Sequence, residues 1–342
     1  MRESRDPSRP ISTEVPATPY THGHHVHGSM SFADPSNERG LWAVKLSLFG
    51  LLATAMLQVV VVGLSGSVAL FADTIHNFGD ALTAVPLWIA FRLSRLKPTD
   101  RFPYGYGKVE DLAGAAVVLL ILFSAVVTGV ESLRRMLQPQ PVQYLGAVAA
   151  AAVIGFLGNE LVALFRIRVG QEIHSAALVA DGYHARADGL TSLAVLGGAA
   201  GVWLGFPLAD PLVGLLITGL IVRILWSSAG MVFLRMIDGV DPAIADEIRE
   251  AAMQVGGVEG VSDVRVRWIG HRLHAEVNLA VGGGLSVQEA HTLAQEARHA
   301  ILHQLPHLSN AILHVDPAGS SGEHFHRVEN HAHGDLQPHF HP

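Results

Sequence analysis

The chain has no cysteine among its 342 residues. Disulfide bonds and thiolate metal ligands are therefore excluded, and a metal site could be built only from His, Asp and Glu. Charge is also scarce: charged residues make up 15% of the chain, against about 25% in an average soluble domain. Because 49% of the residues are hydrophobic and the mean hydropathy is +0.33, the composition indicates a membrane protein.

The two ends lack apolar runs. Residues 1–38 are polar and contain no apolar core of the kind found in a signal peptide. They predict a disordered, His-containing tail, and residues 318–342 predict a second, His-rich one. Together the tails hold ten of the 20 histidines. Such tails could capture metal for loading, or they could be dispensable. The net charge of −7 argues against nucleic acid as a partner.

Six apolar stretches between residues 39 and 232 are long enough to cross a bilayer, which takes about 20 residues of helix. Their short connections predict an all-α domain of antiparallel neighbours embedded in membrane lipid. The predicted spans are Leu41–Leu64, Val68–Phe91, Leu112–Leu133, Leu145–Phe165, Ala176–Leu204 and Asp210–Trp226.

The orientation follows from the basic residues between the spans. Five Lys and Arg residues lie between the second and third spans, Arg166 and Arg168 are assigned to a loop after the fourth, and Arg235 follows the sixth. On the other side, the turns Gly63–Gly66 and Gly205–Pro207 have no basic residue, and the loop between the third and fourth spans has only Arg134 and Arg135. This bias predicts that both termini are cytoplasmic. We expect an integral protein of the cell membrane.

One twelve-residue pattern, A-D-x-x-H-x-x-x-D-x-L-T, occurs twice, at residues 72–83 and 180–191. On a helix, offsets of three, four and seven place the ionisable residues of each copy on one face. Ionisable residues inside a membrane span are costly and indicate function, and each copy is the obvious partner of the other. These residues are Asp73, His76 and Asp80 in the first copy, and Asp181, His184 and Asp188 in the second.

Two imidazoles and two carboxylates, from His76, Asp80, His184 and Asp188, would make a roughly tetrahedral N/O site suited to zinc and its neighbours. A single buried His–Asp pair is as often a structural hydrogen bond. Two matching copies, both in apolar spans, favour a metal or proton site.

Further polar residues within the predicted spans are Asn159, Glu160 and Arg186. Asn159 is expected to make an interhelical hydrogen bond rather than bind metal. Arg186 falls between ligand residues in sequence but points away from their face, and we expect an acidic partner for it.

The last third, residues 233–317, has the mixed pattern of an α+β domain with helices on one face of a sheet. An amphipathic helix is followed by two alternating strands with Gly270 at their turn. A second helix has a capping box from Ser286 to Glu289, and a short strand ends the domain. The predicted elements are Pro242–Val255, Val261–Trp268, His274–Val281, Ser286–Leu305 and Ala311–Val315.

This domain is rich in histidine, which raises the prospect of a cytosolic metal site. His314 and Asp316 lie two residues apart on an extended segment, so their side chains share a face and could share a metal. His299 and His303 have the i, i+4 spacing of a helical ligand pair, although such pairs more often face solvent.

Together these features resemble the cation diffusion facilitator family of metal efflux transporters. The resemblance covers about residues 40 to 317. It rests on the six spans and the H-x-x-x-D pairs of the repeated pattern, together with Y-G-Y-G-K-V-E-D-L at residues 104–112 and H-V-D-P at residues 314–317.

The family implies a homodimer with ferredoxin-like cytosolic domains, in which each protomer exports a divalent metal in exchange for protons. It implies that the two His and two Asp are the transport site, a set associated with zinc preference. Asp73 and Asp181 would have supporting or proton-relay roles.

The chain also departs from the family. Phe102 and Tyr106 stand where some members have metal-binding histidines after the second span, so we expect no such site. Ser262 and Asn278 replace histidines of the two-metal cytosolic site. The cytosolic residues that match are His291, His314 and Asp316. This site is therefore expected to be reduced, or rebuilt with His271 or His274.

The expected mechanism is alternating access around a fixed site in the bilayer, with protons and metal competing for the same atoms. No enzyme activity is expected, because a metalloenzyme would need a free coordination position and a general base. A membrane-bound metal sensor or scaffold that does not transport stays an alternative. So does transport of cobalt, cadmium, nickel, iron or manganese in place of zinc.

Overall fold

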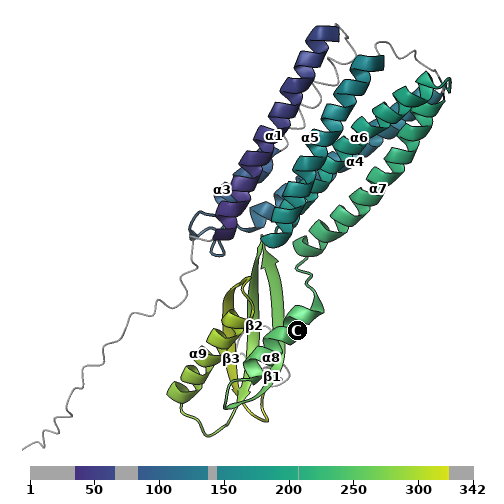
Figure 1. The fold of residues 1–342 in the computed structure, drawn as a ribbon. Coiled ribbons are helices and arrows are strands. Elements are labelled where there is room, and N and C mark those ends of the chain that lie inside the picture. The colour runs from purple at the N-terminus through teal and green to yellow at the C-terminus, as the bar shows by residue number, and fades with distance from the viewer. Residues whose placement is uncertain (1–34, 66–83, 138–144, 207, 323–342) are drawn as a thin grey trace, which may run out of the picture. The chain divides into compact units, whose positions relative to one another are not determined.

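The computed structural model describes residues 35–65, 84–137, 145–206 and 208–322. The predicted tails lie almost wholly outside these ranges, and so does the first copy of the repeated pattern. Six helices precede the predicted cytosolic domain in the described part (Figure 1). They are α1 (Pro35–Ser65), α3 (Ala84–Leu93), α4 (Lys108–Leu137), α5 (Leu145–Glu172), α6 (Ala176–Trp203) and α7 (Ala209–Met236).

Four of these helices, α1, α4, α5 and α7, are long and apolar enough to cross a membrane. Helix α6 is equally long, at 28 residues, but carries the ionisable residues of the repeated pattern. Helix α3 is the described end of the second predicted span. The described helices match the predicted spans in order and extend several of them by about one to three turns.

The assignment of Arg166 and Arg168 to a loop is wrong. Helix α5 continues to Glu172, and only residues 173–175 connect it to α6. Ser175 caps α6, because its side-chain oxygen accepts a hydrogen bond from the Leu178 backbone N–H at 3.1 Å. Arg166 is 1% exposed and lies in the interior of the helix bundle. Its charge therefore says nothing about membrane orientation.

Small residues let α5 and α6 approach so closely that their backbones are nearly in contact. A Cβ added to Gly182 on α6 would lie 2.7 Å from Ile167 Cγ1 and 2.9 Å from the Ile167 backbone nitrogen. A Cβ added to Gly170 on α5 would lie 2.9 Å from the Val179 backbone nitrogen. Such close contact is typical of small-residue helix interfaces in membranes, and it holds α6 firmly against α5.

The cytosolic domain has the predicted order of helix, strand, strand, helix and strand. Strands β1 and β2 pair antiparallel and β2 and β3 pair parallel, so β2 is central. Both helices lie against the sheet (Figure 1). Helices and sheet share one apolar core that includes Ile248, Leu279 and Ile301. The elements are α8 (Pro242–Met253), β1 (Val258–Ile269), β2 (Arg272–Val281), α9 (Val287–Gln304) and β3 (Leu308–Pro317).

Two local predictions in this domain are confirmed. Ser286 and Glu289 form a reciprocal capping box at the start of α9. Gly270 turns the chain between β1 and β2 with φ +63°, a left-handed conformation that suits glycine.

Candidate functional site

The second copy of the pattern lies on α6, where His184 and Asp188 occupy one buried face. Their side chains are spaced one helical turn apart, with His184 Nδ1 3.7 Å from Asp188 Oδ2. The two residues are 2% and 5% exposed. An imidazole and a carboxylate are thus held together inside a bundle of apolar helices. Three other predicted residues, Asp73, His76 and Asp80, lie outside the described residues.

Asp181, one turn before His184, contacts a different group. Arg166 of α5 reaches it, with Nη1 3.0 Å from Asp181 Oδ2, and donates from Nε to Ser47 Oγ of α1 at 2.8 Å. Sequence reasoning misses this arginine because it places Arg166 in a loop. A usable signal is its position in the antiparallel hairpin, where residue 166 falls opposite residue 181.

Asn159 of α5 is 4% exposed and lies beside Gly189 of α6, where an added Cβ would be 3.3 Å from its Cβ. The expected interhelical hydrogen bond from Asn159 is not found among the described residues. Instead the side chain packs against the glycine, within one residue of the level of Asp188. Its supporting role at the candidate site stays a prediction.

The acidic partner expected for Arg186 is Glu160 of α5. The guanidinium donates twice to this carboxylate, from Nε at 3.2 Å and from Nη2 at 2.7 Å. Both side chains are 28% exposed, unlike Arg166 and Asp181. The hairpin of α5 and α6 thus carries two ion pairs of opposite polarity, one fully buried and one half-buried.

In the cytosolic domain the structure brings His314 and Asp316 together on β3. His314 Nε2 lies 2.9 Å from Asp316 Oδ1, with the imidazole 55% exposed and the carboxylate 4% exposed. The Gly322 backbone N–H donates to the other Asp316 oxygen at 3.3 Å. Ser262 and Asn278 lie next to this pair, since Asn278 is opposite His314 in the sheet and Ser262 Oγ is 3.4 Å from the Asn278 carbonyl.

The other predicted cytosolic ligands lie elsewhere in the chain. His274 is opposite Asn310, four residues along β2 from the partner of His314, or about 13 Å away at roughly 3.3 Å per residue. His291 is exposed on α9 and contacts Gln295. In the described ranges no group of three or more His, Asp or Glu side chains could hold a metal. A cytosolic site therefore stays a prediction, centred on His314 and Asp316.

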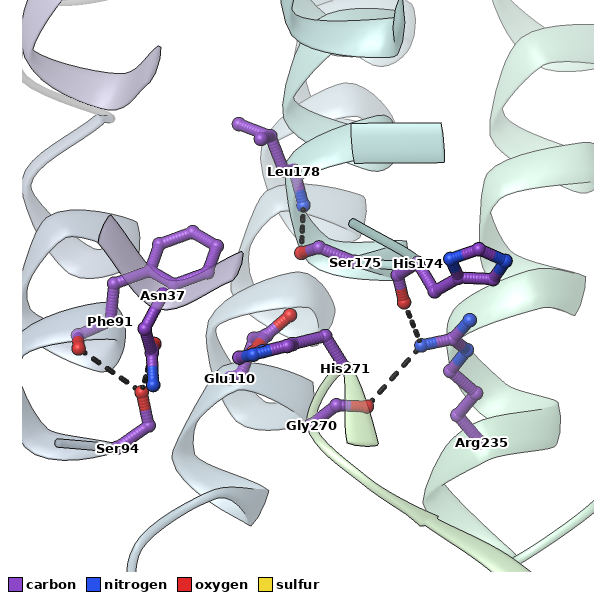
Figure 2. Close-up of polar contacts among 10 residues, drawn as sticks. All are labelled: Asn37, Phe91, Ser94, Glu110, His174, Ser175, Leu178, Arg235, Gly270 and His271. Atoms are coloured by element: carbon purple, nitrogen blue, oxygen red, sulfur yellow. Dashed lines mark hydrogen bonds and ion pairs between the residues drawn. The ribbon is translucent and has the colours of Figure 1, made fainter. Parts of the chain in front are cut away.

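His271 lies beside the first turn of α4, and not with His314. Its Nδ1 is 2.7 Å from Glu110 Oε2, and the two side chains are 4% and 1% exposed (Figure 2). Arg235 of α7 bridges the same region by donating to the carbonyls of His174 and Gly270 at 2.6 and 3.3 Å. These contacts give the polar residues at the start of α4 a role that needs no metal.

The pKa of His274 is lowered to about 4, chiefly by burial and further by the charges of Arg267 and Arg272. This imidazole is therefore neutral at physiological pH, and Ser309 Oγ lies 3.2 Å from its Nε2. Burial also lowers the pKa of His174 between α5 and α6, with His307 and Arg235 adding to the effect. The ring of His174 stacks on Trp268 and contacts His307.

Two family models divide the chain at the point where the fold changes. The model described as the cation efflux transmembrane domain matches residues 44–233, and the model described as the cytoplasmic domain of cation efflux proteins matches residues 240–318. The chain belongs to the cation efflux family. As a family member it is an integral membrane transporter that exports cations, and its H-x-x-x-D pairs lie in the transmembrane domain.

Relatives in this family include proteins with differently named substrates. A "Probable cation efflux system protein" of Mycobacterium tuberculosis (strain ATCC 25618 / H37Rv) is 53% identical over 302 residues, covering 88% of this chain and 91% of that protein. The manganese efflux system protein MneP of Bacillus subtilis (strain 168) is 26% identical, covering 82% and 98%. The cation-efflux pump FieF of Yersinia pestis (strain Pestoides F) is 28% identical, covering 89% and 100%.

Proposed function

We propose that this transporter exports zinc in exchange for protons, through a site formed by His76, Asp80, His184 and Asp188. The observation that carries the proposal is the buried pair on α6, where His184 Nδ1 and Asp188 Oδ2 are 3.7 Å apart in the transmembrane domain. The repeated pattern supplies a second pair of the same chemistry from another span.

Charge balance explains why metal and protons would exchange. A buried carboxylate is strongly destabilised unless a cation neutralises it. The two aspartates carry two negative charges, which a divalent cation balances. When the metal leaves, protons must take over part of that charge, on the carboxylates or on the histidines, whose ordinary pKa is near neutrality. Alternating access to the two sides of the membrane then couples the two flows.

The set of two imidazole and two carboxylate ligands favours zinc over other divalent metals. Two imidazoles with two carboxylates satisfy tetrahedral zinc, whereas manganese and magnesium prefer sites made of oxygen ligands alone. The relationship to a manganese efflux protein makes manganese the second candidate. Competition between zinc and manganese in one transport assay separates these two substrates.

The proposal also covers the assembly of the protein, the cytosolic domain and Asp73. The protein acts as a homodimer with both termini in the cytoplasm, in keeping with its cytoplasmic family domain. His314 and Asp316 form the core of a reduced cytosolic metal site, which needs additional ligands from outside the described residues or from a second copy. Asp73 supports the first pair of ligands, as its place in the repeated pattern suggests.

A vesicle assay tests the proposal. The purified protein is reconstituted with a zinc-sensitive and a pH-sensitive dye in the lumen, and a pH gradient is imposed. In wild type and in His314→Ala we expect zinc to enter the lumen while protons leave it. We expect neither signal in Asp188→Ala. Zinc binding without uptake in wild type would support a sensor, uptake without proton release would remove the coupling, and uptake in Asp188→Ala would show that the site lies elsewhere.

A further inference from the structure

A fully buried ion pair lies one helical turn from the candidate transport ligands. Arg166 and Asp181 are 1% and 0% exposed, and Arg166 Nη1 is 3.0 Å from Asp181 Oδ2. Arg166 also donates to Ser47 Oγ of α1, itself 1% exposed. The guanidinium therefore joins three helices, α1, α5 and α6, in the interior of the bundle.

The Arg166–Asp181 pair makes few hydrogen bonds for two charged groups that are fully buried. Within the described residues neither carboxylate oxygen of Asp181 accepts a hydrogen bond, and Arg166 Nη2 has no hydrogen-bond partner. A buried ion pair of this kind contributes little to stability, and apolar side chains of similar volume often do as well or better. Its presence beside the candidate transport site therefore calls for a reason other than folding.

The position of the pair supplies that reason. Asp181 precedes His184 by three residues on α6, a rise of about 4.5 Å, and shares its face. A guanidinium keeps its positive charge at any pH a protein meets. Without a counter-charge, Arg166 would repel a divalent cation arriving at His184 and Asp188, through an interior where charges are weakly screened.

We infer that Asp181 is a charge-compensating positioning residue: it neutralises Arg166, so that this cation can brace α6 against α5 and α1 without repelling the transported metal. The inference rests on the proposed function. It assigns Asp181 neither a metal-ligand nor a proton-relay role, because the negative charge of its carboxylate already balances a fixed cation, which lies 3.0 Å from Oδ2. It also makes Arg166 part of the framework that holds His184 and Asp188 in place.

The two residues of the pair are not equivalent, and this asymmetry separates the inference from a merely structural role. Loss of Asp181 leaves a permanent positive charge beside the site. Loss of Arg166 leaves a carboxylate, which can become neutral by taking up a proton. Removing both leaves no charge at all. If the pair had only a structural role, either change would lower the stability of the protein, and the KM for the metal would not change.

The test measures the initial rate of zinc uptake into vesicles against zinc concentration. It compares wild type, Asp181→Asn, Arg166→Met and the Arg166→Met/Asp181→Asn double variant. We expect Asp181→Asn to raise KM by about tenfold or more, the expected consequence of an uncompensated nearby charge. Arg166→Met should raise KM less, and the double variant should return KM to within about threefold of wild type.

Glu160→Gln provides the matched control. It also removes the acid from an ion pair between α5 and α6, but its partner Arg186 points away from the ligand face and is 28% exposed. Glu160→Gln should lower the melting temperature and leave KM unchanged. If Asp181→Asn does not fold, Asp181→Ser replaces it, because the hydroxyl can accept from Arg166 while leaving its charge uncompensated.

The outcomes are distinct. A wild-type KM in Asp181→Asn, or a double variant no better than that single variant, would overturn the inference while leaving zinc transport intact. A wild type without zinc uptake would overturn the proposed function, and the inference with it.

Discussion

The chain places a histidine beside an aspartate in two very different settings. On α6, His184 and Asp188 are four residues apart on a helix, and both are buried. On β3, His314 and Asp316 are two residues apart on a strand, and the histidine is 55% exposed. The distances between the paired atoms, 3.7 and 2.9 Å, would favour the strand pair if proximity alone made a site.

The surroundings of the two pairs reverse that order. On β3 the imidazole is exposed to water, and the buried Asp316 carboxylate accepts hydrogen bonds from the Gly322 backbone N–H and the Ser321 hydroxyl, so the strand pair can remain without a metal. In the membrane interior the same two groups need a cation or a proton to offset the loss of water. The helix pair is therefore the stronger candidate for obligatory metal binding, and the strand pair needs further ligands before it could hold a metal tightly.

The comparison is tested most severely by removing each histidine in turn. His184→Ala should lower zinc uptake by about 100-fold or more, because loss of a group that only orients a metal ligand already costs about 10–100-fold. His314→Ala should leave uptake within about threefold of wild type. Both are measured in vesicles at equal protein content. Equal losses in the two variants would mean that the strand pair is as necessary to transport as the helix pair.

A buried histidine outside both pairs gives a pH test. The native pKa of His274 is about 4 and its ordinary value is 6.5, so below pH 6.5 the unfolded chain takes up a proton that the folded one does not. The stability of the cytosolic domain should therefore fall from pH 6.5 to pH 4, by about 3 kcal/mol at most, and be unaffected by this group at higher pH. Pulse proteolysis of the full chain in urea, with a metal chelator present, measures this fall.

His274→Gln should remove most of that dependence, whereas His299→Gln, at an exposed position on α9, should keep it. An identical pH profile in wild type and His274→Gln would show that other groups cause the loss of stability.

The close approach of α5 and α6 predicts a steric effect. Gly182→Ala should destabilise the protein by about 1–3 kcal/mol, because its new methyl group would meet the Ile167 backbone nitrogen at 2.9 Å. Gly219→Ala on α7 meets no described atom within 4 Å of the new Cβ and should be neutral or slightly stabilising. Thermal unfolding in detergent compares the two. A stable Gly182→Ala variant with full uptake would show that the helices do not need this contact.

Ion pairs offer the smallest contrast between membrane and cytosol. Arg186→Met should cost about 2 kcal/mol, because it leaves the Glu160 carboxylate half-buried between two transmembrane helices. Arg265→Met breaks a 2.9 Å pair with Asp263 on the exposed side of β1 and should cost less than about 0.5 kcal/mol. The melting temperatures of both variants measure these two costs. A larger loss of stability in Arg265→Met than in Arg186→Met would refute the role given to the bilayer.

Much of this architecture follows from the sequence because it depends on the spacing of apolar residues and on the residues that start or end helices and strands. Apolar length gives the spans, strand alternation and Gly270 give β1 and β2, and the Ser286–Glu289 box gives the start of α9. The i, i+4 spacing likewise places His184 and Asp188 on one helix face. These are local properties, which can be read along the chain.

The contacts between distant segments are harder to predict. Sequence reasoning assigns Arg166 to a loop because an arginine in an apolar run is costly until its partner, Asp181, is known. His271 resembles a ligand by composition, yet tertiary packing joins it to Glu110, 161 residues away. The offset between His274 and His314 depends on the register of two parallel strands, which spacing along the chain does not reveal.

The most direct test of the central claim is a crystal structure of the zinc-loaded protein with anomalous scattering measured at the zinc absorption edge. We predict a zinc peak in the transmembrane domain, bound by His184 and Asp188 of α6 together with His76 and Asp80, and absent in Asp188→Ala. Zinc found only beside His314 and Asp316, with the transmembrane site empty at saturating zinc, would contradict the account.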